Sequence, residues 1–124
     1  MDKILMEGLA FYGYHGVLEE EKRLGQKFFI DVALYVDLKK AGITDDLNYT
    51  VNYEEVYRII EKIIRTEQYN LLEALAEKIC EKVLNSFNVV QKINIKIKKP
   101  EAPVAGIFDC LAVQIERERK GSDE

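Results

Sequence analysis

The sequence predicts an α+β fold, in which a four-stranded antiparallel sheet carries two helices on one of its faces. Three observations lead to this prediction. The length of 124 residues suits a single domain, assigned to residues 1–120, followed by a disordered tail at 121–124. Hydrophobic residues make up 48% of the chain, as in an ordered protein with one core. The spacing of apolar residues changes from period two to a helical period and back, which gives the order β-β-α-α-β-β.

The first two strands are predicted at residues 3–12 and 27–38. The first segment is rich in β-branched and aromatic residues, and the second alternates apolar with other residues. A loop with three glycines and the acidic run Glu19 to Glu21 separates them. A connection of this length favours an antiparallel pair.

The two helices follow from apolar stripes at residues 53–64 and 72–87, where the apolar positions recur every three or four residues. A capping signal precedes each stripe. Asn52 is followed three residues later by Glu55, and Asn70 is followed in the same way by Glu73. We therefore expect both helices to begin at these asparagines.

The last two strands are predicted at residues 93–98 and 107–115, where the period returns to two. Pro100 and Pro103 interrupt the pattern between them. In several strands both alternating sets contain large apolar residues, such as Phe28 on one face and Phe29 on the other. The second face of the sheet is therefore expected to be buried by another subunit, which predicts a homo-oligomer.

Composition excludes several classes of function. The net charge of −4 disfavours a nucleic-acid partner, and no apolar run is long enough for a membrane span. The amino terminus lacks the features of a signal peptide, so a cytoplasmic location is expected. Cys80 and Cys110 fall in apolar patterns and are interpreted as buried thiols. With His15 as the single histidine, no imidazole-based metal site is expected.

Two charged residues stand at the ends of predicted elements. Glu73 lies in the first turn of the second helix, where it could complete a capping box or clamp a pair of N–H groups on a ligand. The helix dipole favours its negative charge. Lys99 follows the third strand and, by alternation, points to the side of the isoleucines. A lysine on that side is unusual and is typically paired or used in acid–base chemistry.

Three further residues have a structural and a functional interpretation. Tyr53 either begins the apolar stripe or donates a phenolic proton. Glu21 would be a solvated charge from composition alone. His15 is either a hydrogen-bonded loop residue, which we favour, or a substrate contact.

Taken together, four segments resemble dihydroneopterin aldolases in order and spacing, across about residues 3–119. They are Phe11-Tyr12-Gly13-Tyr14-His15-Gly16, Thr50-Val51-Asn52-Tyr53, Asn70-Leu71-Leu72-Glu73 and Lys99-Pro100-Glu101-Ala102-Pro103. The resemblance implies the T-fold, with sheets of several subunits joined into a barrel, and a tetramer or octamer with sites at subunit interfaces. It implies cleavage of 7,8-dihydroneopterin, a pterin substrate, to 6-hydroxymethyl-7,8-dihydropterin and glycolaldehyde in folate synthesis, without a cofactor.

The same resemblance implies roles for individual residues. Glu73 would bind the aminopyrimidine edge of the pterin, assisted by the backbone of Leu72 and Val51. Lys99 would be the acid–base residue and Glu21 would close the site beside it. Tyr53 would assist proton transfer and come from the neighbouring subunit.

Two alternatives remain open at this point. A related epimerase acts on dihydroneopterin triphosphate and would invert the 2′ carbon, although the run from Tyr12 to Gly16 resembles the aldolase more closely. Some 2′-epimerase activity is expected beside cleavage in either case. A non-catalytic pterin-binding or scaffold protein of the same fold would not need the combination of Glu21, Tyr53, Glu73 and Lys99.

Overall fold

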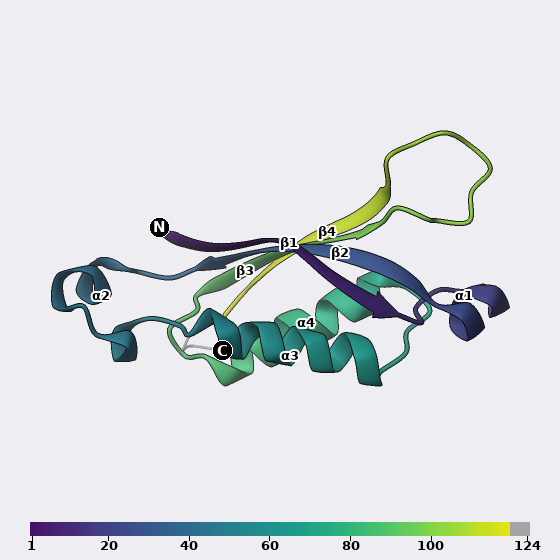
Figure 1. Ribbon diagram of the computed structural model, residues 1–124. Helices are drawn as coiled ribbons and strands as arrows, with labels where there is room; N and C mark the ends of the chain where they lie inside the picture. Colours follow the sequence, from purple (N-terminus) through teal and green to yellow (C-terminus); the bar gives the residue numbers. More distant parts are fainter. Residues whose placement is uncertain (120–124) are drawn as a thin grey trace.

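The architecture was analysed in a computed structural model, which describes residues 1–119, so the predicted tail at 121–124 lies outside the described residues. Four strands form one antiparallel sheet in the order β1-β2-β3-β4. Two long helices cover one face of this sheet (Figure 1). The predicted α+β class and its element order are confirmed. The strands are β1 (Lys3–Gly13), β2 (Gln26–Tyr35), β3 (Lys92–Lys99) and β4 (Leu111–Glu118), and the long helices are α3 (Tyr53–Thr66) and α4 (Leu72–Ser86).

The core lies between the sheet and the two long helices. The apolar side chains on one face of the strands pack there against the apolar side chains of the two helices. Many of these side chains have no exposed surface. Fully burying an aliphatic side chain of this size contributes about 1.5–3 kcal/mol. The fully buried residues include Ile30, Leu34, Ile93, Ile95 and Ile97 from the sheet and Ile60, Ile64, Leu75 and Ile79 from the helices.

Three short helices were not predicted. They are α1 (Glu19–Leu24), α2 (Lys39–Thr44) and the 3-10 helix η1 (Leu47–Tyr49). Each is too short to show an apolar stripe. In α1 the three consecutive glutamates occupy the first turn, where the helix dipole stabilises negative charge.

The helix starts follow the capping prediction in one case only. The Asn52 side chain accepts a hydrogen bond from the backbone N–H of Glu54 at 3.0 Å, as expected of an N-cap. The prediction for Asn70 is wrong, because α4 begins one residue later, with Leu71 in the N-cap position and no side-chain cap. Glu73 is then the second residue of α4, so the predicted capping box does not form.

The last strand begins and ends later than predicted, at 111 and 118 instead of 107 and 115. Lys99 pairs with Leu111, so residues 107–110 belong to the long loop that projects beyond the sheet (Figure 1). Ile107 is fully exposed there, although its apolar alternation suggested a strand. Cys80 is buried as predicted, whereas Cys110 lies in this loop and is only half-buried.

The helix-free face of the sheet is more polar than predicted. Lys98 forms an ion pair with Asp31 at 2.8 Å, and the Gln114 amide donates to Asn94 at 2.8 Å. Phe29 and Tyr35 lie among these polar groups and are half-buried within the single chain. The homo-oligomer expected from apolar residues on this face stays a prediction. Of the helices in residues 1–119, none is both long and apolar enough to span a membrane.

Candidate active site

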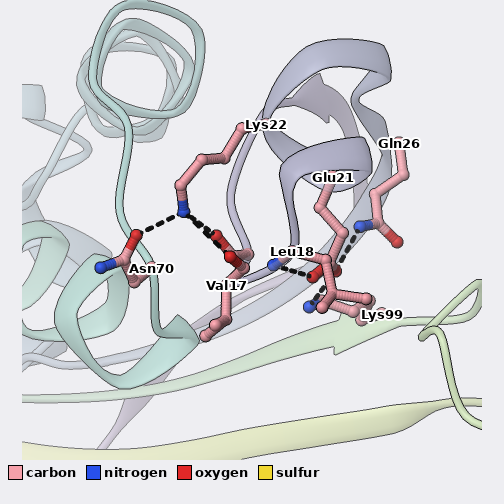
Figure 2. A network of polar contacts seen from close by, with 8 residues as sticks. Val17, Leu18, Glu21, Lys22, Gln26, Asn70 and Lys99 are labelled. Carbon is pink, nitrogen blue, oxygen red and sulfur yellow. Dashed lines mark hydrogen bonds and ion pairs between the residues drawn. The ribbon is translucent and has the colours of Figure 1, made fainter.

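Helix α1 places a carboxylate against the end of β3. The Lys99 ammonium lies 2.7 Å from Oε2 of Glu21, and the two side chains are 13% and 8% exposed (Figure 2). Lys99 is thus on the side of the buried isoleucines, as the alternation predicted. The expectation that Glu21 is a solvated charge was wrong, because the pairing with Lys99 was invisible in composition.

The Glu21 carboxylate has two further donors. The side-chain amide of Gln26 donates to it at 2.9 Å and the backbone N–H of Leu18 at 3.3 Å. Burial acts to raise the pKa of Glu21, but the bonds from Lys99, Gln26 and Leu18 together hold that pKa below its ordinary value. The site therefore presents an ionised carboxylate that orients an ammonium group. Sequence reasoning missed Gln26, which carries no periodic or motif signal.

Gly16 makes room for this pair. A side chain at position 16 would overlap the Glu21 carboxylate, and the backbone there has φ of +155°. Both observations require glycine. The glycine that follows His15 thus has a packing role in seating Glu21.

His15 is a buried, fully hydrogen-bonded loop residue, which agrees with the favoured interpretation. Its Nδ1 accepts the backbone N–H of Tyr69 at 3.1 Å, so Nε2 carries the proton and donates to the carbonyl of Ile64 at 3.0 Å. The ring also meets Phe28 edge-on, at 5.5 Å between ring centroids. His15 thereby joins the segment after β1 to the end of α3 and to the loop before α4.

This geometry predicts a pH-dependent contribution of His15 to stability. Burial, the largest cause, lowers the pKa of His15 below its ordinary 6.5. The unfolded chain then binds more protons than the folded one, so the free energy of unfolding should decline as the pH falls below 6.5. In His15→Phe we expect a loss of about 1–3 kcal/mol at pH 8, from the unpaired backbone groups, and a smaller loss at pH 5.5. Urea unfolding at both pH values measures this, with Tyr14→Phe as the control, and an equal loss at both would contradict it.

Glu73 lies in the first turn of α4 and is exposed. The capping box does not form, and the role of Glu73 as a ligand-binding carboxylate stays a prediction. Leu72, beside it, is half-buried and packs against the core. This fixes the start of α4 while the carboxylate of Glu73 faces solvent.

Tyr53 and Val51 lie elsewhere in the chain. Helix α3 begins at the end of the sheet nearest α2, whereas α1 and the start of α4 lie at the opposite end (Figure 1). Tyr53 is 63% exposed and lines a groove of about 360 Å³ together with residues of β1. Val51 is buried. A single chain therefore brings Glu21, Lys99 and the start of α4 to one end and leaves Tyr53 at the other.

The arrangement of acidic, histidine and cysteine side chains shows whether the described residues could bind a metal ion. Within residues 1–119, no group of three or more His, Cys, Asp or Glu side chains is placed to hold a metal ion. The paired Glu21 and Lys99 can orient, accept and donate protons. The exposed carboxylate of Glu73, in the first turn of α4, can accept paired N–H bonds from a ligand.

Comparisons with known proteins agree with this description. Residues 4–116 match the family model described as FolB, dihydroneopterin aldolase. The chain is 45% identical to the dihydroneopterin aldolase of Bacillus subtilis (strain 168), covering 96% of this chain and 99% of that protein. It is 39% identical to dihydroneopterin aldolase 1 of Arabidopsis thaliana, covering 99% of this chain and 85% of that protein.

A solved structure extends the agreement to the backbone. The Escherichia coli dihydroneopterin aldolase, crystallised in complex with neopterin, superimposes with a TM-score of 0.86 at 28% identity. The match covers 94% of this chain and 99% of that one. The T-fold expected from the sequence motifs is thereby confirmed. On the evidence of its sequence, its fold and this nearly full-length similarity, the chain belongs to the dihydroneopterin aldolase family.

Proposed function

We propose that this aldolase cleaves 7,8-dihydroneopterin by acid–base chemistry centred on Lys99 and Glu21. Membership of the family makes the chain a carbon–carbon lyase of folate biosynthesis. The observation that carries the proposal is the buried contact of 2.7 Å between the Lys99 ammonium and the Glu21 carboxylate, next to the start of α4. It supplies a proton-transfer group whose position is set by the fold.

The substrate supplies the electron sink. In 7,8-dihydroneopterin the ring C6=N5 bond is adjacent to C1′ of the side chain. When the 2′-hydroxyl loses its proton, the C1′–C2′ bond breaks, C2′ and C3′ leave as glycolaldehyde, and the electron pair moves through C6 to N5 as an enamine. Protonation of C1′ then gives the 6-hydroxymethyl product. The protein therefore has to hold the ring, move protons and exclude water.

Lys99 acts from its neutral amine form and takes the 2′-hydroxyl proton through a water molecule. It thereby becomes the ammonium that pairs with Glu21, and Glu21 keeps the group oriented for that transfer. Tyr53 assists protonation of C1′. Since α3 begins at the far end of the sheet, we assign Tyr53 of each pocket to a neighbouring copy of the chain. General acid–base groups of this kind contribute about 10²- to 10⁴-fold each.

Glu73 anchors the pterin. Its carboxylate accepts two parallel N–H bonds from the aminopyrimidine edge, with backbone groups of Leu72 and, from the neighbouring copy, Val51 completing the contacts. The dipole at the start of α4 interacts favourably with the negative charge of Glu73. In this proposal Glu73 binds the pterin and Lys99 transfers the proton, so different residues perform the two functions.

The assembly and location follow from the same proposal. We place the pocket at the boundary between copies in a tetramer or octamer, formed as the free edges of β1 and β4 join sheets into a barrel. The polar helix-free face would then line the barrel. A cytoplasmic location is part of this proposal.

Incubation of the assembled protein with 7,8-dihydroneopterin in the presence of a chelator tests the function. We expect equal amounts of glycolaldehyde and 6-hydroxymethyl-7,8-dihydropterin, together with a minor 2′-epimer formed when the cleaved pieces recombine. A folded oligomer that yields the epimer alone would establish the epimerase instead. Borohydride added during turnover should leave the mass of the chain unchanged, and a covalent adduct on Lys99 would contradict the acid–base mechanism.

A further inference from the structure

The side chains of Glu21 and Lys22, which are consecutive in α1, make contacts in different directions (Figure 2). Glu21 meets Lys99 at the end of β3. The Lys22 ammonium lies 2.6 Å from the carbonyl oxygen of Gly16 and 2.6 Å from Oδ1 of Asn70. One turn of helix thus touches both the acid–base pair and the loop before α4.

The loop that Lys22 reaches ends in the proposed pterin anchor. Asn70 is three residues before Glu73 and directly precedes the N-cap of α4. Further hydrogen bonds join the same two segments, from the Gly16 N–H to the carbonyl of Tyr69 at 3.0 Å and from the Gln68 amide to the carbonyl of Lys22 at 3.4 Å. Lys22 therefore belongs to a seam between the two halves of the site.

The chemistry of these contacts is specific. An ammonium group has three donors, and Lys22 directs them to the Gly16 carbonyl, the Asn70 amide oxygen and, at 3.4 Å, the Val17 carbonyl. Such charge-assisted bonds are stronger than neutral ones and repay the entropy of ordering a long side chain.

Asn70 contributes an independent observation. Asparagine is among the preferred N-cap residues, yet here its oxygen is used by Lys22 and α4 begins without a side-chain cap. The start of α4 therefore lacks the stabilisation that a side-chain cap would give. Gly16 is constrained on both sides as well, because its carbonyl accepts from Lys22 while its missing side chain makes room for Glu21.

We infer that Lys22 is a positioning residue for the proposed aldolase reaction. Through Gly16 and Asn70 it sets the spacing between the Glu21–Lys99 pair and the anchor at Glu73, without touching the substrate. This inference rests on the proposed function, because it assigns the two halves to proton transfer and to pterin binding. A misplacement of about 1 Å between such halves is enough to slow a reaction by up to about 10²-fold.

The test compares Lys22→Met with Arg23→Met, a cationic control from the same helix. Among residues 1–119, no hydrogen bond or ion pair of the Arg23 side chain is present. We expect Lys22→Met to lower kcat at least tenfold and Arg23→Met to leave kcat within twofold of the parent. The dissociation constant of 6-hydroxymethylpterin, which lacks the cleavable side chain, should change by less than threefold. Lys22→Arg should recover part of the lost kcat.

Non-additivity separates positioning from a general loss of stability. Asn70→Ala should also lower kcat, whereas Asn70→Asp, which keeps an acceptor for Lys22, should stay near the parent. The double variant Lys22→Met/Asn70→Ala should lose no more than about threefold beyond the more damaged single variant. All assays run well below the measured melting temperature of each variant.

Three results would overturn the inference: a kcat for Lys22→Met within threefold of the parent, an equal loss in Arg23→Met, or losses that multiply in the double variant. The parent reports separately on the proposed function, because a parent that releases no glycolaldehyde refutes the aldolase assignment itself. In that case the seam is a purely structural feature.

Discussion

Replacing Lys99 with methionine is expected to lower kcat by about 10²- to 10⁴-fold while pterin affinity changes little. The reason is the division of tasks within the site. In the proposed mechanism Lys99, which is paired with Glu21 at 2.7 Å, exchanges the substrate proton, whereas the ring is held at the start of α4. Single-turnover kinetics with 7,8-dihydroneopterin measure the chemical step, and titration with 6-hydroxymethylpterin measures binding.

A second variant separates charge from proton transfer. Lys99→Arg retains a cation beside the buried Glu21 carboxylate, so it avoids the cost of an unpaired buried charge. Its guanidinium remains protonated near neutral pH and does not act as a base, so kcat should still fall by at least about 10²-fold. Lys98→Met is the matched control, since Lys98 pairs with Asp31 on the helix-free face. Near-parental turnover in Lys99→Arg would show that Lys99 acts only as a charge.

Replacing Glu73 with glutamine is expected to weaken pterin binding by about 10- to 150-fold, which corresponds to the 1.5–3 kcal/mol typical of a hydrogen bond to a charged group. The amide keeps the shape of the side chain but turns one acceptor into a donor facing the N–H edge of the ligand. Calorimetric titration with 6-hydroxymethylpterin measures the loss. The value of kcat at saturating substrate should fall far less than in Lys99→Met.

Glu81→Gln on the same helix is the control for Glu73→Gln. Glu81 is exposed, and its contact with Lys78 is a loose ion pair at 3.9 Å. Its replacement removes the same charge from α4 without altering the first turn. Equal weakening in the two variants would attribute the effect to the net charge of the helix, and unchanged affinity in Glu73→Gln would remove the anchor from the proposal.

Periodicity was sufficient for the larger elements. The alternation in β2 and β3 and the stripes of α3 and α4 each bury one side of an element, and burial is the dominant stabilising term. The same alternation correctly placed Lys99 among the isoleucines. These predictions succeeded because a single physical requirement, an apolar face of fixed period, specified each of them.

The details around the site had no such signal. Helix α1 has six residues and no apolar face, and the Glu21 carboxylate that it carries is paired with Lys99, 78 positions away along the chain. Asn70 resembles an N-cap, but an ammonium group competes with the helix for its side-chain oxygen. The apolar alternation around Ile107 continues past the last residue that has a partner strand. In the first two cases a contact between distant segments overrode a local pattern, and in the third the local pattern extends beyond the strand pairing.

Because Tyr53 and Lys99 lie at opposite ends of the chain's sheet, the activity should depend on the concentration of the protein. In the proposed assembly, a solitary molecule would hold two unlike half-pockets and no whole one. Diluting the protein until its subunits dissociate should therefore lower the turnover per chain. Mixing two inactive variants of the chain should instead restore activity. A Tyr53→Phe chain and a Lys99→Met chain, each nearly inert alone, would regain activity after their subunits exchange, since some boundaries would then unite two undamaged halves.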